Sequence, residues 1–457
     1  MTERVSTITT MTNRSVMTPL PSPDDRYAAG RAAREHMPLE TLGVWDPSMR
    51  NHDALATVVE QNAARVPSLV PIRMARMSAS PWSYYRGAAA VMAADLATLG
   101  HTGIDVQMGG DAHLLNFGLW ATPERQLSFD VRDFDETLRG PFEWDLKRYL
   151  ASLVVLARDT GLSEDTAAKA VQGAVRAYRN HISRYATASE LDIWYDLVTS
   201  DQLLQRLFEP EEMEEVSERL RRRAKRRTHT GAALKLTRVV AGQLRIVDNP
   251  PARTRLNDLV DGSASAEVVT EALQNYRDSL PYERRYLLDR FTFADVVRQV
   301  VGVGSVGMQV YLVLLEGRQG DPLFLQLKQA GPSVYEQYLG SSQYPNHGQR
   351  VIKGKRLIQA ASDIFLGWTS GSGVDFYVRQ FRDMKVVPDA ALIAPFLVQF
   401  AEMCGAVLAR AHARTGDAVA IAGYIGKGRR FDRAMMTFAG SYADQTSVDH
   451  AQLRAAV

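Results

Sequence analysis

Polar residues that could bind a metal or a phosphate lie close together in the stretch GDAHLLNFG, residues 110–118. Asp111, His113 and Asn116 occupy positions i, i+2 and i+5 within it. Carboxylate and amide oxygens at such a spacing suit a phosphate that is bound through Mg²⁺. The alternative is a set of solvated turns, where Asp and Asn are common because their side chains bond to the local backbone.

A second acidic stretch, RDFDE at residues 132–136, follows a short predicted strand. A phosphotransferase needs one carboxylate to orient or deprotonate the acceptor hydroxyl, and an Asn and a further Asp to hold Mg²⁺ between the phosphates. In protein kinases the first Asp and the Asn lie five residues apart on one loop, and the metal-binding Asp follows the next hairpin. This spacing predicts Asp111 as the catalytic carboxylate, Asn116 and Asp133 as metal ligands, and Asp135 as an assisting ligand.

Two further residues are expected to position this loop. We expect His113 to be structural and to orient the loop by hydrogen bonds. Asp145 lies at the start of the helix predicted for PFEWDLKRYLASLVVLARDTG, where it can accept hydrogen bonds from backbone amides of the loop. A zinc site of Asp111, His113 and Asp133 is a poor alternative, because it has one His and no nearby Cys.

The segment GVGSVG, residues 302–307, matches the pattern G-x-G-x-x-G. A Rossmann fold requires a helix directly after these glycines, but the sequence that follows, MQVYLVLLEG, is apolar and rich in strand-forming residues. The predicted structure is strand–loop–strand, in which Gly302, Gly304, Ser305 and Gly307 bring backbone amides to nucleotide phosphates. The alternative is a tight hairpin that only needs glycine backbone angles.

Lys328 lies within the apolar predicted strand LFLQLKQA, where an ammonium group costs desolvation energy unless it meets an anion. In kinases a lysine of the third strand contacts the α- and β-phosphates and a helix glutamate. Glu336 is the first acidic residue downstream and is the predicted partner. The alternatives are an edge-strand lysine that reaches water and an exposed glutamate at a helix start.

The elements that carry these residues divide the chain into regions. We predict a disordered tail over residues 1–24, a helical catalytic region over 25–290, an antiparallel sheet over 291–388, and a helical segment over 389–457 that packs back on the catalytic region. Within them, residues 80–100 are predicted as one helix, and the strand at 374–385 as a hinge that offers backbone groups to adenine. The basic run at 219–238 is expected to be a solvated helical face, or else a patch that attracts an anionic substrate.

Composition sets the class of protein. The chain has 457 residues, 46% hydrophobic and 23% charged, with a formal net charge of +2, which does not indicate a nucleic-acid-binding protein. The single cysteine, Cys404, lies in an apolar helical stretch and is expected to be a core residue in a reducing compartment. The N-terminus lacks an apolar signal-peptide core, and no apolar run reaches the roughly 18 residues of a membrane span. We expect a cytoplasmic protein without membrane contact.

Residues that could recognise an acceptor substrate occur upstream of the catalytic loop. They are equally consistent with packing between lobes and anchoring of loops. They are Arg73, Arg76, Trp82, Tyr84, Tyr85 and Arg86.

Two resemblances to known families follow from these motifs. GDAHLLNFG resembles the catalytic loop of aminoglycoside phosphotransferases and choline kinases, and RDFDE followed by GPFEWDL resembles their metal-binding loop. From about residue 25 onward, the chain resembles an uncharacterised bacterial family, domain of unknown function 2252. The phrases that match this family are VPIRMARMSASPWSYYRGAA, GDAHLLNFG, DFDETLRGPFEWDLKR, VVGVGSVG, LQLKQA and YADQ. The family name implies no activity.

The order of the motifs differs from that in kinases. The glycine segment and Lys328 follow Asp111 by about two hundred residues, whereas in kinases they precede the catalytic Asp. The resemblance therefore implies a circularly permuted, two-lobed kinase-like fold of the α+β class, with a largely helical lobe and a small antiparallel sheet lobe. The implied function is ATP- and Mg²⁺-dependent phosphoryl transfer to a small-molecule hydroxyl. The alternatives are a non-catalytic, nucleotide-binding pseudokinase and a nucleotidyl (AMP) transferase.

Overall fold

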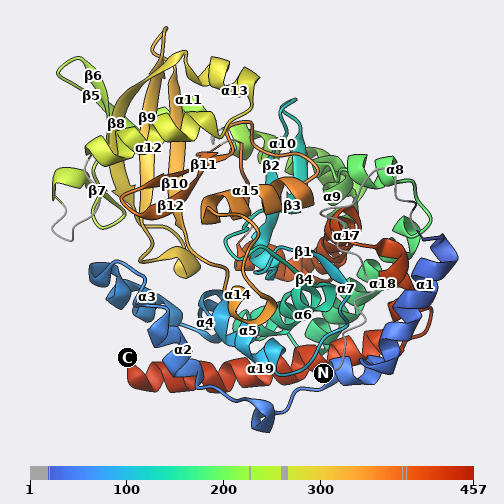
Figure 1. The fold of residues 1–457 in the computed structure, drawn as a ribbon. Coiled ribbons are helices and arrows are strands. Elements are labelled where there is room, and N and C mark those ends of the chain that lie inside the picture. Colours follow the sequence, from blue (N-terminus) through green and yellow to red (C-terminus); the bar gives the residue numbers. More distant parts are fainter. Residues whose placement is uncertain (1–18, 20, 226–227, 259–265, 383, 387–388) are drawn as a thin grey trace.

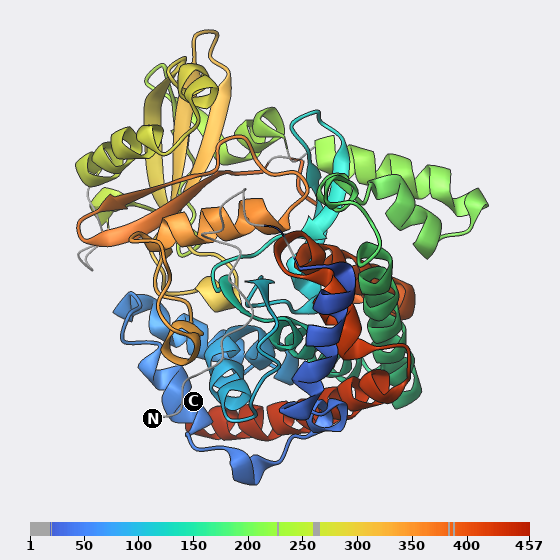
Figure 2. The ribbon, with the colours of Figure 1, turned by 45° about the vertical axis from the view of Figure 1, so that its right-hand side comes forward.

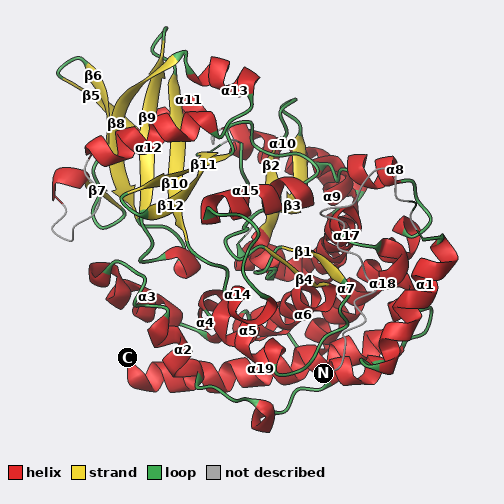
Figure 3. Ribbon diagram, in the orientation of Figure 1, coloured by secondary structure: helices red, strands yellow, loops and turns green. Residues whose placement is uncertain are grey.

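The computed structural model describes residues 19, 21–225, 228–258, 266–382, 384–386 and 389–457. Its described part consists of a helical body and an antiparallel sheet that lies against one side of this body (Figures 1 and 3). The α+β class predicted from the sequence is confirmed. Most of the predicted tail at 1–24 lies outside the described residues. The chain is already helical from Pro23, where the Ser22 side chain accepts a hydrogen bond from the Asp25 amide.

The helical body is built from segments at both ends of the chain. Its helices are α1 (Pro23–Ala32), α2 (Ala54–Glu60), α3 (Val70–Met77), α4 (Pro81–Gly87), α5 (Ala89–Ala97), α6 (Phe142–Asp159), α7 (Glu164–Tyr185), α8 (Glu190–Tyr195), α9 (Ser200–Leu207), α10 (Pro210–Lys225), α16 (Ala390–Ile393), α17 (Leu397–Thr415), α18 (Ala418–Ile425) and α19 (Arg430–Ala456). The C-terminal α19 runs along the base of the body, beneath the N-terminal helices α2, α4 and α5 (Figures 1 and 2).

The large sheet has six antiparallel strands in the order β11-β12-β10-β9-β8-β7. These strands are β7 (Arg253–Arg255), β8 (Phe291–Gln299), β9 (Val310–Gly317), β10 (Pro322–Ala330), β11 (Gly367–Gly371) and β12 (Val374–Gln380). The elements around it are α11 (His229–Leu236), the hairpin β5 (Thr237–Val240) and β6 (Gln243–Ile246), α12 (Ala266–Asp278), α13 (Tyr282–Leu288), α14 (Glu336–Leu339) and α15 (His347–Ile358). The sheet region therefore begins upstream of the predicted boundary at residue 291, because β7 pairs with β8 and α12 packs on β11.

Strand β10 shows how the sheet joins apolar packing to a polar site. Leu325 and Leu327 point to the face that α12 covers, whereas Phe324 packs with residues of α11 and β6 on the opposite face. Because side chains alternate along a strand, Gln326 and Lys328 share the face of Phe324. Both are buried although they are polar, so this end of the face needs polar partners from outside the sheet.

Two short antiparallel strand pairs in the helical body carry the predicted catalytic loops. One pairs β1 (Asp105–Met108) with β4 (Leu138–Pro141), and the other is the hairpin of β2 (Phe117–Ala121) and β3 (Leu127–Val131). The GDAHLLNFG loop leads from β1 to β2, and the RDFDE loop leads from β3 to β4. Both loops therefore connect the same two strand pairs, and both line the cavity described below.

Helix α17 is a core helix. The stretch Ala390–Thr415, which includes it, is the one helical stretch among the described residues with the length and apolarity to cross a membrane, by composition alone. In the structure α17 packs closely along α7, and a Cβ at Gly405 would lie 2.5 Å from the Ala174 carbonyl oxygen. Cys404 is buried in this contact. Packing in the core accounts for the apolar composition of the helix.

The predicted continuous helix at 80–100 is wrong. Ser80 caps the helix as expected, since its hydroxyl accepts from the Ser83 amide at 3.2 Å. The helix then breaks at Ala88 into α4 and α5. Gly87 lies against Met77, and its carbonyl accepts a hydrogen bond from the buried Arg73 guanidinium at 3.1 Å. This tertiary bond uses a carbonyl that a continuous helix would have needed for itself.

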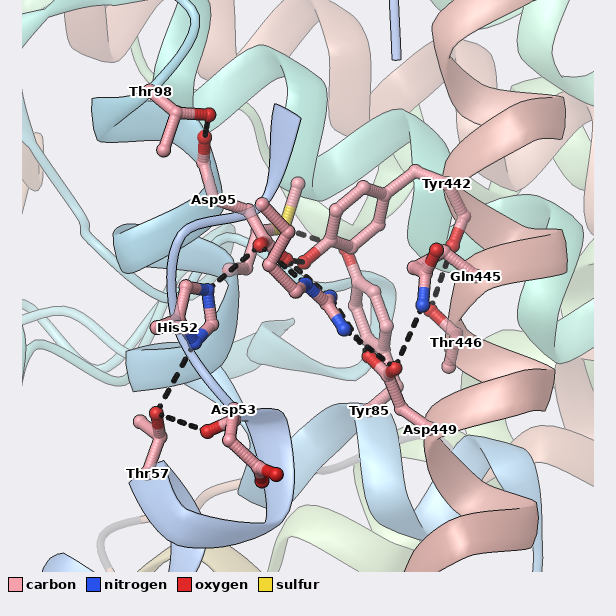
Figure 4. A network of polar contacts seen from close by, with 12 residues as sticks. His52, Asp53, Thr57, Tyr85, Asp95, Thr98, Tyr442, Gln445, Thr446 and Asp449 are labelled. Atoms are coloured by element: carbon pink, nitrogen blue, oxygen red, sulfur yellow. Dashed lines mark hydrogen bonds and ion pairs between the residues drawn. The ribbon is translucent and has the colours of Figure 1, made fainter. Parts of the chain in front are cut away.

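A buried polar network ties the two ends of the chain together (Figure 4). The Arg50 guanidinium donates to both oxygens of Asp95, at 2.8 and 2.7 Å, and to both oxygens of Asp449 in α19, at 2.7 and 3.0 Å. Asp95 also contacts the His52 ring at 2.8 Å and accepts from the Tyr442 hydroxyl at 2.7 Å. Each buried charge in the network is therefore matched by an opposite charge or a hydrogen-bond donor.

Candidate active site

A cavity of about 210 Å³ lies between the helical body and the sheet, and most of the predicted site residues line it. Those that do are Asp111, Asn116, Asp133, Asp135, Gly302, Gly304, Ser305 and Lys328. Gly307 and Glu336 do not. The contact of Lys328 with Asp135 spans 193 positions of the chain, so the cavity gathers residues that only the tertiary fold brings together. We call it the carboxylate cavity.

Asp145 positions the GDAHLLNFG loop, as its place at a helix start predicted. Its two carboxylate oxygens accept hydrogen bonds from the amides of Gly109 and Gly110, at 2.6 and 2.8 Å. His113 orients the loop through its backbone, since its amide donates to the Asp111 carbonyl and its carbonyl accepts from the Asn116 amide, both at 2.8 Å. Its ring packs edge-on against Trp82, and the buried Nδ1 has no partner among the described residues. The loop is thus held from the first turn of α6.

Asp111 is fixed in orientation mainly by its ion pair with Arg148. Its Oδ1 accepts from Nε of Arg148 at 2.6 Å, and its backbone oxygen accepts from Nδ2 of Asn116, also at 2.6 Å. Burial raises the pKa of the Asp111 carboxyl, against the opposing effect of the Arg148 charge. The other carboxylate oxygen, Oδ2, lies 3.8 Å from Nε2 of His113, which is beyond hydrogen-bond distance, and is the oxygen that a ligand in the cavity would meet.

Asp133 has the surroundings of a metal ligand. Its carboxylate forms no hydrogen bond or ion pair with any described residue, although it lines the cavity. Burial raises the pKa of this carboxyl, but the charges of Lys328, Arg379 and Arg132 outweigh burial and hold it well below its usual range. Asp133 is therefore a carboxylate anion with open coordination positions.

The donor set fits Mg²⁺ bound together with phosphates. Asn116 commits its amide nitrogen to the Asp111 carbonyl, which leaves its amide oxygen available next to Asp133 in the cavity lining. Among the described residues, no group of three or more His, Cys, Asp and Glu side chains is arranged to hold a metal alone. This fits Mg²⁺, which proteins hold with one or two carboxylates while phosphates and water complete the octahedron, and it argues against the zinc alternative in the described part of the chain.

Lys328 has a different carboxylate partner from the one predicted. Its ammonium group forms an ion pair with Oδ2 of Asp135, whose Oδ1 accepts from the Tyr377 hydroxyl at 2.8 Å. Glu336 instead accepts from the amide of Ser333 at 2.9 Å and lies 3.5 Å from Nε of Arg350. Glu336, which we expected to orient Lys328, therefore stabilises the segment that connects β10 to α15 instead.

The glycine segment has the predicted strand–loop–strand structure, between β8 and β9. The helical body anchors it. The Gly307 carbonyl accepts from the Val66 amide at 2.7 Å, and Nη1 of Arg65 donates to the Gly304 carbonyl at 3.1 Å. Gly307 adopts φ of +90°, which disfavours any residue with a Cβ, so this glycine serves the turn. Gly302, Gly304 and Ser305 are the part of the segment that faces the cavity.

Several cations of the cavity were not predicted as site residues. Arg65, Arg132, Arg379 and Lys385 line it, together with Arg86, which the sequence had only placed in a mixed group of packing and recognition residues. Nε of Arg86 is buried without a partner in the described structure, and the charges of Asp111 and Asp133 act on its guanidinium. One indication for Arg86 was present in the sequence, its position close to Trp82 and Tyr85. The local sequence alone could not decide whether this group of residues binds a substrate or packs in the core.

Comparisons with known proteins establish the family. The family model described as "Uncharacterized protein conserved in bacteria (DUF2252)" matches residues 65–456. The chain belongs to this family, as the sequence phrases indicated. Searches of curated proteins and of solved structures gave no significant match.

Proposed function

We propose that the protein is an ATP- and Mg²⁺-dependent phosphotransferase that acts on the hydroxyl group of a small molecule. One observation carries this proposal: Asp111, Asn116 and Asp133 from the helical body share one cavity with Lys328 and the glycine loop of the sheet. Phosphoryl transfer needs these groups together, because positioning and charge stabilisation do nearly all of the catalysis.

In this proposal Asp111 accepts the proton of the acceptor hydroxyl. The acceptor oxygen forms a bond to the γ-phosphorus, the bond from that phosphorus to the bridging oxygen of ADP breaks, and ADP leaves with the electron pair. Arg148 holds the Asp111 carboxylate in one orientation through its 2.6 Å bond. The charges of both Asp111 and Asp133 act on Arg86. In this proposal the Arg86 guanidinium offsets the negative charge that develops on the transferred phosphoryl group.

The remaining residues bind the nucleotide. Asp133 and the Asn116 amide oxygen would hold Mg²⁺, which supplies positive charge against the β- and γ-phosphates when it is bound. Lys328 would meet phosphate oxygens from the sheet side, and Asp135 keeps its ammonium group in place before the nucleotide arrives. The backbone of Gly302–Ser305 would cover the phosphates from above.

We also propose that the fold is a kinase-like arrangement in permuted order. The hairpin β2–β3 separates Asn116 from Asp133, and Lys328 lies on the third of three successive antiparallel strands, two strands after the glycine loop begins. Both placements match the relations that kinases show within each lobe. Only the order of the two parts along the chain differs.

Calorimetric titration of ATP into wild type and Asp133→Ala, with and without Mg²⁺, tests the proposal. We expect binding that requires both Mg²⁺ and Asp133, because the carboxylate has no structural bond to lose and the variant should fold. Asp165→Ala, which removes an exposed carboxylate of α7, is the matched control and should bind as wild type does. ATP binding that is equal in wild type and Asp133→Ala would contradict the assignment.

The product distinguishes the two catalytic outcomes. With ATP labelled separately at the α- and γ-phosphates, transfer of the γ-label to an acceptor supports phosphoryl transfer, and transfer of the α-label supports the nucleotidyl alternative. Binding that depends on Asp133 without transfer to any offered acceptor would favour the pseudokinase alternative.

A further inference from the structure

A second cavity of about 300 Å³ adjoins the carboxylate cavity and is rich in cations. The two cavities share Arg132, Arg379 and Lys385 in their linings, so they lie next to each other. The second one, which we call the cation cavity, lies between the ends of β2 and β12 and the C-terminal half of α15. No role predicted from the sequence involves its lysines.

Four separate elements each contribute a cation to this space. Arg132 follows β3, Lys355 comes from α15, Arg379 lies in β12, and Lys385 lies in the segment after β12. The Lys355 ammonium forms no hydrogen bond or ion pair with any described residue. Arg379 donates at 2.9 and 2.7 Å to Oε1 of Gln326, which is a neutral acceptor.

Carboxylates near this cluster offset its charge only in part. Asp363 lies in the lining and accepts from the amides of Phe365 and Gln380, and Arg132 and Lys385 have partners in the protein. The charges of Asp363 and Asp133 both act on Lys355, but burial, followed by the neighbouring charge of Arg379, lowers the pKa of Lys355 to about 8. Lys355 therefore holds its positive charge at a cost in free energy that a bound anion would reduce.

The backbone beside the cavity offers little to adenine. The Gln380 amide donates to Asp363, and the Phe381 amide donates to the Phe324 carbonyl at 2.9 Å. These two donors of the predicted hinge are engaged within the protein. Arg382 is a fifth cation of the lining, and the side chains of Trp120 and Phe381 add apolar walls beside the cations.

We propose that the cation cavity is a phosphate-binding subsite, which takes the phosphate group of an organic phosphate while its less polar part rests on Trp120 and Phe381. Guanidinium and ammonium donors that converge from several sides suit a phosphate dianion. The site goes beyond the proposed function and does not depend on it.

Two ligands share this chemistry. The phosphate could belong to a phosphorylated second substrate that lies beside the nucleotide, or to the pyrophosphate end of a nucleotide that spans both cavities. In the second case the α-phosphorus would lie nearest to Asp133.

Titration of inorganic pyrophosphate into the full chain, with EDTA present to exclude Mg²⁺, tests the subsite. We expect wild type to bind and Lys355→Gln to lose roughly ten- to hundredfold in affinity, as for the loss of one charge-assisted contact. Because the Lys355 side chain bonds to no described residue, its replacement should not unfold the protein, and Lys355→Arg should restore much of the affinity. Lys169→Gln, which removes an exposed lysine of α7, should bind as wild type does.

Two results would overturn the proposal: no pyrophosphate binding by wild type at millimolar concentration, or equal binding by wild type and Lys355→Gln. Asp133→Asn separates this outcome from that of the proposed function, since it removes a carboxylate from the carboxylate cavity and should leave pyrophosphate binding intact or stronger. A competition experiment between pyrophosphate and ATP identifies which ligand supplies the phosphate. Displacement of pyrophosphate by ATP assigns the subsite to the nucleotide, and simultaneous binding of both assigns it to a second substrate.

Discussion

Arg50 and Lys355 are both cations largely withdrawn from water, and the protein surrounds them in opposite ways. Arg50 donates four hydrogen bonds to two buried carboxylates, in a network that joins the N-terminal segment to α19. Lys355 has no such partner in the described structure and lies among other cations. A buried charge that is fully paired serves the fold, whereas a buried cation that bonds to no described residue, such as Lys355, fits the proposed site for an anionic ligand.

The largest effect should come from breaking the paired network. Arg50→Ala leaves Asp95 and Asp449 buried without their cation, and we expect the free energy of unfolding to fall by about 3–5 kcal/mol. Urea denaturation monitored by circular dichroism measures this change. The control is Arg219→Ala, which breaks an exposed pair with Glu215 and should cost less than about 0.5 kcal/mol. A loss for Arg50→Ala as small as that of the control would show that the network adds nothing to stability.

Lys355→Met should have the opposite sign and raise the free energy of unfolding by about 3 kcal/mol at pH 7, the free energy that corresponds to the shift of the Lys355 pKa from 10.5 to about 8. Below pH 8 the lysine is charged in both states, and the folded state carries the full cost. Between pH 8 and 10.5 the unfolded chain binds more protons than the folded one, so wild type gains stability as pH rises.

Thermal unfolding of wild type and Lys355→Met at pH 7 and pH 9.5 measures the difference, which should shrink at the higher pH. Pyrophosphate at pH 7 should stabilise wild type more than the variant, because only the intact subsite binds it. Equal stability of the two proteins at pH 7 would mean that the Lys355 charge is already compensated.

A second buried lysine in the same region, Lys328, allows the same substitution to be compared at a paired position and at one without a partner in the described structure. Lys328 is paired with Asp135, and although burial lowers its pKa, Asp135 and Tyr377 raise it above its ordinary value. The pair therefore contributes its full stability below pH 10.5, and Lys328→Met should lower the free energy of unfolding by about 1–3 kcal/mol at pH 7. The same Lys-to-Met change should thus stabilise at one position and destabilise at the other. Stabilisation by Lys328→Met in the same urea assay would place Lys328 in the class of Lys355.

The parts of the site that the sequence predicted are those fixed by short spacing. Asp111 and Asn116 are five residues apart on one loop, and Asp133 lies one hairpin further on, so local structure alone brings all three to one edge. The strand–loop–strand structure of residues 291–317 was predictable in the same way, because the residues after Gly307 form a short continuous apolar run that a glycine turn soon ends. Asp145 was predictable from its place in the first turn of a helix.

The parts that the sequence did not predict depend on contacts between distant segments. Lys328 pairs with Asp135 and not with Glu336. The Glu336 carboxylate instead accepts a hydrogen bond from the Ser333 amide in the loop that precedes it. Lys355 and Arg379 belong to a helix and a strand whose own patterns are ordinary, and only the packing of α15 against β12 makes them neighbours. No local signal marks such a cluster.

The close contact between α1 and α18 also sets the order in which the molecule can be assembled. Arg26 of α1 bonds with Asp417, 391 positions later, at the start of α18. At a synthesis rate of roughly 5–20 residues per second, α1 leaves the ribosome roughly 20–80 s before its partner does. Helix α1 must wait for that time without its main packing partner, whereas α2 to α5 can already pack on one another and on α6.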